Sequence, residues 1–151
     1  MVTSSLVAIY KPTDTKQSKF NEKDWTDPNG KNVTPYEKSK TLAEKAAREY
    51  LAKLPENERF EFVTINPGFI LGPNIHRARG SFTSGDVIKK FLTGKIPMCP
   101  LLNMGMVDIR DVAQAHLNAV LRPEADGHRF MLVGHSMWFN EMGPVLYKKF
   151  G

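Results

Sequence analysis

Residues 34–54 read TPYEKSKTLAEKAAREYLAKL and carry a nearly complete set of helix signals. Thr34 is suited to be the N-cap, and Glu37 follows three residues later as the acidic partner of a capping box. Pro35 falls at the first helical position, where its missing N–H costs nothing. The stretch therefore predicts a helix from Pro35 to about Lys53.

Helical spacing also predicts which face of this helix is buried. The apolar positions of that face are Ala43, Ala47, Tyr50, Leu51 and Leu54. Extended toward the N-terminus, the same stripe passes through Lys40 and Tyr36, which are stacked one turn apart. A lysine at the head of a buried stripe is costly unless its charge has a use. An ammonium about 4 to 6 Å from a phenol favours the phenolate, which suits a tyrosine to general acid–base catalysis.

The rest of the chain alternates between strand and helix patterns. Strands are predicted at the start of MVTSSLVAIY, over residues 1–4, in FEFVTIN at 60–66 and in HRFMLVG at 128–134. A polar, proline-containing loop is expected over residues 11–33. Together with the helices, this order predicts an α/β protein with a largely parallel sheet.

Three more helices are predicted after the second strand. One covers residues 86–92, with Ser84 as its cap, and is followed by a loop over 94–106. The next begins after Asp108, and a C-terminal helix is expected to be interrupted near Pro144. The inner face of the helix after Asp108 is predicted to hold Val112, Ala115 and Ala119, with His116 on or beside it.

Composition excludes several classes of protein. The 151 residues are 41% hydrophobic and 25% charged, and no apolar run reaches the roughly 18 residues of a membrane span. The N-terminus lacks the features of a secretory signal, and the single cysteine, Cys99, excludes an internal disulfide, so a reducing cytoplasmic location is expected. The four histidines and Cys99 show no metal-ligand spacing, so no metal is predicted.

The net charge of +5 does not by itself predict a nucleic-acid partner. Many basic residues lie within reach of a helical acid, as Arg48 does with Glu44, which is typical of a solvated helix face. The densest basic cluster, over residues 76–79, has no interleaved aromatic side chains for base stacking. We therefore expect neither a nucleic-acid nor a membrane partner.

Four sequence blocks resemble a known family. VTSS at 2–5, PYEKSKTLAEKAA at 35–47, INPGFILGP at 65–73 and MVDIRDVAQAHLNAV at 106–120 are similar, in order and spacing, to the extended short-chain dehydrogenase/reductase superfamily of the epimerase/dehydratase type. Within it they most resemble dihydroflavonol 4-reductases, cinnamoyl-CoA reductases and related aldehyde or ketone reductases. The resemblance implies a Rossmann-like, doubly wound parallel sheet and NADP(H)-dependent reduction of a carbonyl, or the reverse oxidation of an alcohol.

The resemblance also implies roles for individual residues. Tyr36 matches the proton donor to the substrate carbonyl, and Lys40 matches the residue that tunes the tyrosine and holds the nicotinamide ribose. Ser5, in preference to Ser4, matches the serine that polarises the carbonyl oxygen. The remaining predicted cofactor contacts are Pro67, Gly68, Phe69 and Ile70, beside the nicotinamide, and Ser84, whose hydroxyl is alternatively only a helix cap. Residues 74–102 fall where the family shapes its substrate pocket.

The chain departs from the family pattern in one respect. It contains no GxGxxG or GxxGxxG motif, the Gly-rich turn that brings a helix N-terminus to the pyrophosphate. The expectation is therefore a single partial domain over residues 1–151, the C-terminal portion of such an enzyme with the first βαβ half missing, and impaired activity of the chain alone. NADP(H) is the expected cofactor on resemblance alone, with NAD(H) not excluded.

Alternatives to a carbonyl reductase remain open from sequence. A sugar-nucleotide epimerase or a 3β-hydroxysteroid dehydrogenase-like enzyme would use the same serine, tyrosine and lysine. A non-catalytic interaction module derived from the fold is a different class, and it would pair with a second copy or with a longer homologous chain, using the helix over residues 35–53. Tight NADPH binding would favour an enzyme, and stable association without cofactor binding would favour the module.

Overall fold

The computed structural model describes residues 1–10, 19–73, 83–96 and 102–150. Within these ranges the helices are α1 (Pro35–Lys53), α2 (Thr83–Leu92), α3 (Ile109–Leu121) and α4 (Phe139–Phe150). The strands are β1 (Val2–Thr3), β2 (Thr64–Pro67), β3 (Phe69–Leu71), β4 (Asn103–Asp108), β5 (Arg129–Leu132) and β6 (His135–Trp138). Short 3-10 turns occupy η1 (Leu6–Ala8), η2 (Glu56–Glu58) and η3 (Pro123–Ala125). No helix in the described part of the chain is long and apolar enough to cross a membrane.

The strands form two three-stranded sheets. The first has the order β1-β2-β5, and all its strands are parallel, with Thr3 opposite Ile65 and Ile65 opposite Phe130. The second has the order β3-β4-β6, in which β3 and β4 are parallel and β6 runs antiparallel to β4. The α/β class and the largely parallel sheet are confirmed, and β6 is the exception.

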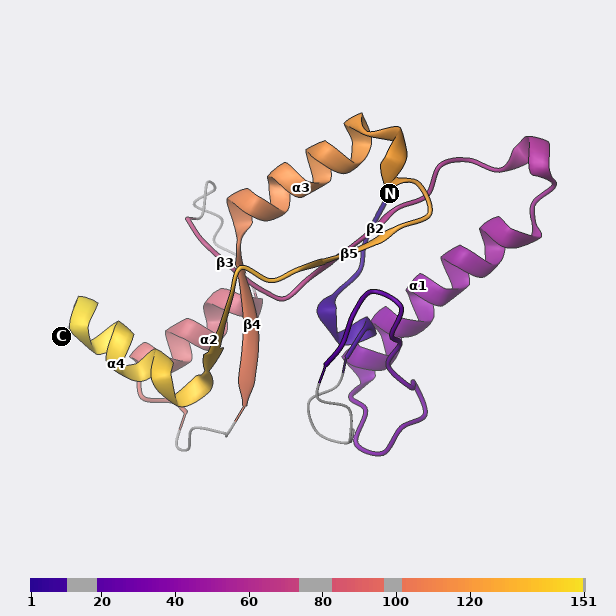
Figure 1. The fold of residues 1–151 in the computed structure, drawn as a ribbon. Helices are drawn as coiled ribbons and strands as arrows, with labels where there is room; N and C mark the ends of the chain where they lie inside the picture. Colours follow the sequence, from indigo (N-terminus) through magenta and orange to yellow (C-terminus); the bar gives the residue numbers. More distant parts are fainter. Residues whose placement is uncertain (11–18, 74–82, 97–101, 151) are drawn as a thin grey trace.

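Alternation along β2 directs its side chains to two different helices. Thr64 and Asn66 are fully buried and hydrogen-bond to Glu44 of α1. Ile65, between them, points to the other face, where it belongs to a core with Ala119 of α3 packed against it. Figure 1 accordingly shows α1 and α3 on opposite sides of β2 and β5. This arrangement gives the first sheet one face toward each helix.

The signals read at the start of α1 are confirmed in detail. The Thr34 hydroxyl accepts a hydrogen bond from the Glu37 amide at 3.2 Å, and the Glu37 carboxylate accepts one from the Thr34 amide at 2.7 Å. The helix runs from Pro35 to Lys53 as predicted. These interactions are local, so their outcome depends little on the rest of the fold.

The predicted buried face of α1 is correct only in part, since Ala47, Leu51 and Leu54 of the apolar stripe are half-buried and none of its residues is fully buried. The fully buried side chains of the helix are Thr41 and Glu44, whereas Ala43 and Tyr50 of the apolar stripe are exposed. The pair of Glu44 and Arg48, read as part of a solvated face, instead faces the sheet. The reason is that the first sheet presents polar side chains to α1, so the helix turns a polar face inward.

Other elements also differ from their sequence predictions. The second strand, expected over residues 60–66, is observed as β2 at Thr64–Pro67. The strands β3, β4 and β6 were not predicted, and β4 includes residues from the loop expected over 94–106. The helix α2 begins at Thr83, which places Ser84 inside the helix, so its predicted role as N-cap is wrong. The helix α4 continues through Pro144. A proline inside a helix removes one backbone donor and crowds the carbonyl four residues earlier, and α4 continues despite both effects.

Candidate functional site

Ser5 lies at the carboxyl end of β1, where the chain turns into η1. Its backbone is extended, and its hydroxyl accepts a long 3.4 Å hydrogen bond from the Val7 amide. Among the described residues its hydroxyl hydrogen has no acceptor, whereas the Ser4 hydroxyl donates to Glu44 at 2.5 Å. Both serines are buried. Of the two hydroxyls, that of Ser5 is therefore the better placed to donate to a ligand, and the preference for Ser5 as the catalytic serine remains a prediction.

The first turns of α1 lie against this strand end. The Lys40 ammonium donates to the backbone carbonyl of Thr3 at 3.4 Å, and α1 packs against η1. Tyr36 precedes Lys40 by one turn on the same side of the helix, and its side chain is exposed. The structure thus brings Ser5, Tyr36 and Lys40 to the same end of the first sheet, the carboxyl edge at which α/β proteins bind ligands.

The segment over residues 67–70 joins the two sheets at this edge. The side-chain amide of Asn66, the residue before Pro67, donates to the Ser5 carbonyl at 3.1 Å, and Phe69 and Ile70 pair with β4. The Gly68 amide donates to the Leu132 carbonyl at 3.0 Å, so this donor is already used within the fold. The expected contacts of this segment with a cofactor remain a prediction.

Ser84 is not brought to this edge. It lies in α2, which packs against β3 and is drawn in Figure 1 well apart from α1. Residues 74–82 and 97–101, which make up much of the predicted substrate pocket, lie outside the described residues. The structure therefore groups the serine, tyrosine and lysine, and leaves Ser84 apart from them.

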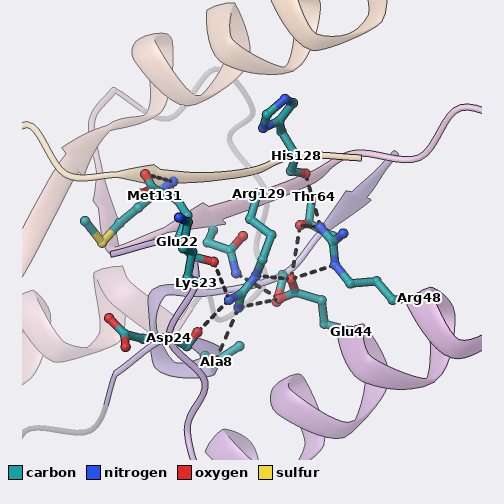
Figure 2. Close-up of polar contacts among 12 residues, drawn as sticks. Ala8, Glu22, Lys23, Asp24, Glu44, Arg48, Thr64, His128, Arg129 and Met131 are labelled. Carbon is teal, nitrogen blue, oxygen red and sulfur yellow. Dashed lines mark hydrogen bonds and ion pairs between the residues drawn. The ribbon is translucent and has the colours of Figure 1, made fainter. Parts of the chain in front are cut away.

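Sequence reasoning missed a cluster of buried polar side chains centred on Glu44, which we call the Glu44 cluster. Its members are Ser4, Glu44, Arg48, Thr64, Asn66 and Arg129. Figure 2 shows Arg129 of β5 reaching the Glu44 carboxylate from one side and Arg48 from the other. A carboxylate that receives this many donors is held in one position. One sequence feature could have indicated this cluster: the i, i+4 spacing of Tyr36, Lys40, Glu44 and Arg48, which places the four side chains on one face of the helix.

The surroundings of Glu44 act on its pKa in two directions. Burial alone raises the pKa, because it disfavours the charged form. Hydrogen bonds from Arg129, Ser4 and Asn66, with the nearby positive charge of Arg129, outweigh burial and lower the pKa below its ordinary value of 4.5. Glu44 is therefore a carboxylate at neutral pH, as its partners require.

This lowered pKa makes the stability of the fold sensitive to acid. Because the folded pKa of Glu44 lies below the unfolded one, its charge stabilises the fold above pH 4.5, and this contribution is lost as the pH falls through the folded pKa. We expect the free energy of unfolding, measured in urea, to fall below pH 4.5, and to fall less steeply in Glu44→Gln. An NMR titration in which the Glu44 carboxyl carbon titrates above 4.5 would contradict this account.

A pocket elsewhere in the molecule does not contain the predicted site. It has a volume of about 410 Å³ and opens between α3 and β5, beside side chains that include Ala115, Arg122, His128 and Phe130. Ser5, Tyr36, Lys40 and the segment over residues 67–70 do not line it. Its members on the strands, such as Phe130, belong to the sheet face opposite α1. The pocket is thus separate from the carboxyl edge.

The architecture defines the class of the protein. Parallel strands end at one edge, helices cover opposite faces of the sheet, and a serine at a strand end lies beside a helix that carries a tyrosine and a lysine. This is part of a Rossmann-like α/β fold. A family model described as the NAD dependent epimerase/dehydratase family matches residues 1–134, and the chain belongs to this family.

Individual relatives are reductases. The NADPH-dependent methylglyoxal reductase GRE2 of Saccharomyces cerevisiae is 31% identical over 99% of this chain and 47% of its own length. Cinnamoyl-CoA reductase 1 of Arabidopsis thaliana is also 31% identical, over 99% of this chain and 42% of its own. The crystal structure of Gre2 from Candida albicans in complex with NADPH matches with a TM-score of 0.79 at 29% identity, covering 98% of this chain and 47% of that one. The chain spans about half the length of the curated relatives it matches.

Proposed function

We propose that this chain carries the catalytic residues of an NADPH-dependent reductase that acts on a small-molecule carbonyl compound. The observation that carries the proposal is the contact of the Lys40 ammonium with the Thr3 carbonyl, because it holds the helix of Tyr36 against the strand end of Ser5. The relatives that bind or use NADPH support the choice of cofactor. The two curated relatives named above are reductases, which favours carbonyl reduction over the alternatives.

The donors at the carboxyl edge fit the nicotinamide end of such a cofactor. The Lys40 ammonium and the Tyr36 hydroxyl suit the hydroxyls of a ribose, and Pro67, which follows the Asn66 that donates to the Ser5 carbonyl, is proposed as a wall of the site. A Gly-rich phosphate-binding turn is absent from the sequence, so these residues fit the nicotinamide-ribose end and not the pyrophosphate. When bound, NADPH supplies the hydride for the carbonyl carbon.

The chain's own residues would then handle the carbonyl oxygen. The Ser5 hydroxyl donates a hydrogen bond to that oxygen and stabilises the charge that develops on it. The Tyr36 hydroxyl delivers the proton, and the Lys40 ammonium stabilises the phenolate that remains. Residues 74–102 would shape the substrate pocket. Reduction of an aldehyde or ketone to an alcohol follows from these three roles.

The test is NADPH binding and carbonyl reduction by the purified chain, followed by NADPH fluorescence and absorbance with methylglyoxal and a panel of aldehydes and ketones. We expect Tyr36→Phe to lower kcat about 10²- to 10⁴-fold, the usual contribution of a positioned general acid. Lys40→Ala should also weaken NADPH binding.

Matched controls come from the other end of the same helix. Tyr50 is 61% exposed, close to the 57% of Tyr36, and Lys53 ends the helix, so Tyr50→Phe and Lys53→Ala should leave binding and kcat unchanged. Wild-type rates in Tyr36→Phe, or no NADPH binding by the folded wild-type chain at millimolar cofactor, would overturn the proposed function for this chain.

The proposal also covers the location and the assembly of the chain. A cytoplasmic location is proposed from the single cysteine, which is typical of proteins in reducing compartments. Pairing with a second copy or with a longer homologous chain is proposed through the outer face of α1, where Leu42 and Tyr50 are exposed. Size-exclusion chromatography with light scattering, comparing Leu42→Glu with wild type, tests the pairing.

A further inference from the structure

A single buried carboxylate links α1 to every strand of the first sheet. Glu44 is 1% exposed and accepts hydrogen bonds from Ser4 at the end of β1 at 2.5 Å and from Arg129 of β5 at 2.6 Å. It also accepts from Thr64 at 3.0 Å and Asn66 at 2.9 Å, both in β2. These four donors approach one side chain from three strands. The carboxylate therefore determines where α1 lies on the sheet.

Successive turns of α1 contact successive residues at the end of β1. Lys40 donates to the carbonyl of Thr3, and Glu44, one turn later on the same side of the helix, accepts from the hydroxyl of Ser4. The next residue of the chain is Ser5. Two successive turns of the helix are thus held to two successive residues of the strand. Rotation or sliding of α1 would break both contacts at once and would move Tyr36 relative to Ser5.

We propose that Glu44 is a positioning residue, which acts through Ser4 to hold the turn of Tyr36 and Lys40 in register with Ser5. The proposal rests on the proposed function, since it assigns Glu44 to the same site. It also gives Ser4 a role: with its hydroxyl committed to Glu44, the strand end offers the Ser5 hydroxyl alone to a substrate oxygen. Glu44 itself, enclosed by its four donors, touches no substrate.

Two substitutions separate positioning from simple stabilisation. Ser4→Ala and Thr64→Val each delete one buried hydroxyl that donates to Glu44, but only Ser4 adjoins Ser5. Displacing catalytic groups by about 1 Å costs about 100-fold in rate. We expect Ser4→Ala to lower kcat about 10- to 100-fold with little change in KM for NADPH. Thr64→Val should lower the midpoint of urea unfolding and leave kcat within about twofold.

A double-mutant cycle tests whether Ser4 acts through Glu44 or directly on the substrate. Glu44→Asp keeps the charge that Arg129 needs but shortens the side chain by one methylene, so it should lower kcat as Ser4→Ala does. If Glu44 acts through Ser4, the double variant should be no slower than the slower single variant. Multiplication of the two losses would mean that Ser4 acts on the substrate directly, and would overturn the proposal.

Hydrogen exchange distinguishes failure of the positioning role from failure of the proposed function. In the chain without cofactor, Ser4→Ala and Glu44→Asp should speed amide exchange over residues 34–41 at the start of α1, and Thr64→Val should not. If wild type neither binds NADPH nor reduces a carbonyl, but this exchange pattern is found, Glu44 holds the start of α1 through Ser4 as inferred, and only the proposed function falls. Equal exchange over residues 34–41 in all three variants would overturn the inference, whatever the activity.

Discussion

Arg129→Met is expected to lower the free energy of unfolding by about 3 to 5 kcal/mol, because it removes the nearer of the two cationic partners of a fully buried carboxylate. The Arg129 guanidinium donates to Glu44 at 2.6 Å and to the backbone carbonyls of Glu22 and Asp24 at 2.8 and 2.6 Å, and it stacks 3.7 Å from the ring centre of Trp25. Methionine fills similar space but donates to none of these groups. The substitution therefore removes the strongest charged donor of the buried carboxylate, which keeps Ser4, Thr64 and Asn66 as donors and Arg48 at 3.6 Å, and it takes this donor from two backbone carbonyls.

Urea unfolding at neutral pH measures this loss, and two further variants interpret it. Arg110 pairs with Asp108 at 2.7 Å, but both lie at the surface, so Arg110→Met should change stability little. Combining Arg129→Met with Glu44→Gln removes the stranded charge, so the double variant should lose less than the sum of the single losses. An Arg129→Met chain as stable as Arg110→Met would show that water reaches Glu44 and that the Glu44 cluster is not a buried ion pair in solution.

Gly68→Ala is expected to destabilise the fold by about 3 kcal/mol or more, the upper range of overpacking. A Cβ at Gly68 would lie far inside van der Waals contact with the carbonyl oxygen of Gly105 and 2.9 Å from its carbonyl carbon. Both are backbone atoms of β4, so no side-chain rotation relieves the clash. The chain crosses here from the first sheet to the second, and the close approach of two backbones requires the glycine.

Gly134→Ala is the matched control for this prediction. The nearest atom to a Cβ at Gly134 is the Met106 carbonyl oxygen at 3.7 Å, an ordinary contact, so this variant should unfold close to wild type. Thermal unfolding of the two variants, side by side, is the measurement. Equal melting temperatures would mean that β2 and β4 separate at the crossing without cost. Gly68 also belongs to the segment expected to contact the cofactor. Its close approach to Gly105 is sufficient to explain why a glycine is needed there, without a bound ligand.

The candidate site was predictable to the extent that its residues lie in short, recognisable blocks. Tyr36 and Lys40 are one helical turn apart, and Ser5 ends a strand, so local pattern and family resemblance predicted all three. Ser84 shows the limit of this approach. A hydroxyl before a helical pattern reads equally as a cap or as a ligand contact, and the structure places it inside α2, away from α1.

The Glu44 cluster was not predictable in the same way. In sequence, Glu44 and Arg48 form an i, i+4 pair like those on any solvated helix. Burial of Glu44 depends on Arg129, which is 85 residues away, and on Thr64 and Asn66 in another strand. No local sequence pattern predicts that Arg129, Thr64 and Asn66 all point toward the same face of α1.

The sequence alone determined the features that depend on neighbours a few residues apart: the capping box and extent of α1, the Asp108 cap of α3, the alternation of strands and helices, and the blocks that identify the family. Tertiary structure alone decided the second sheet, the polar face that α1 buries, and the single carboxylate that holds the helix to three strands. The reason is physical. Caps satisfy backbone groups within one turn, whereas the burial of a charge is stable only when distant segments deliver its partners to the same point.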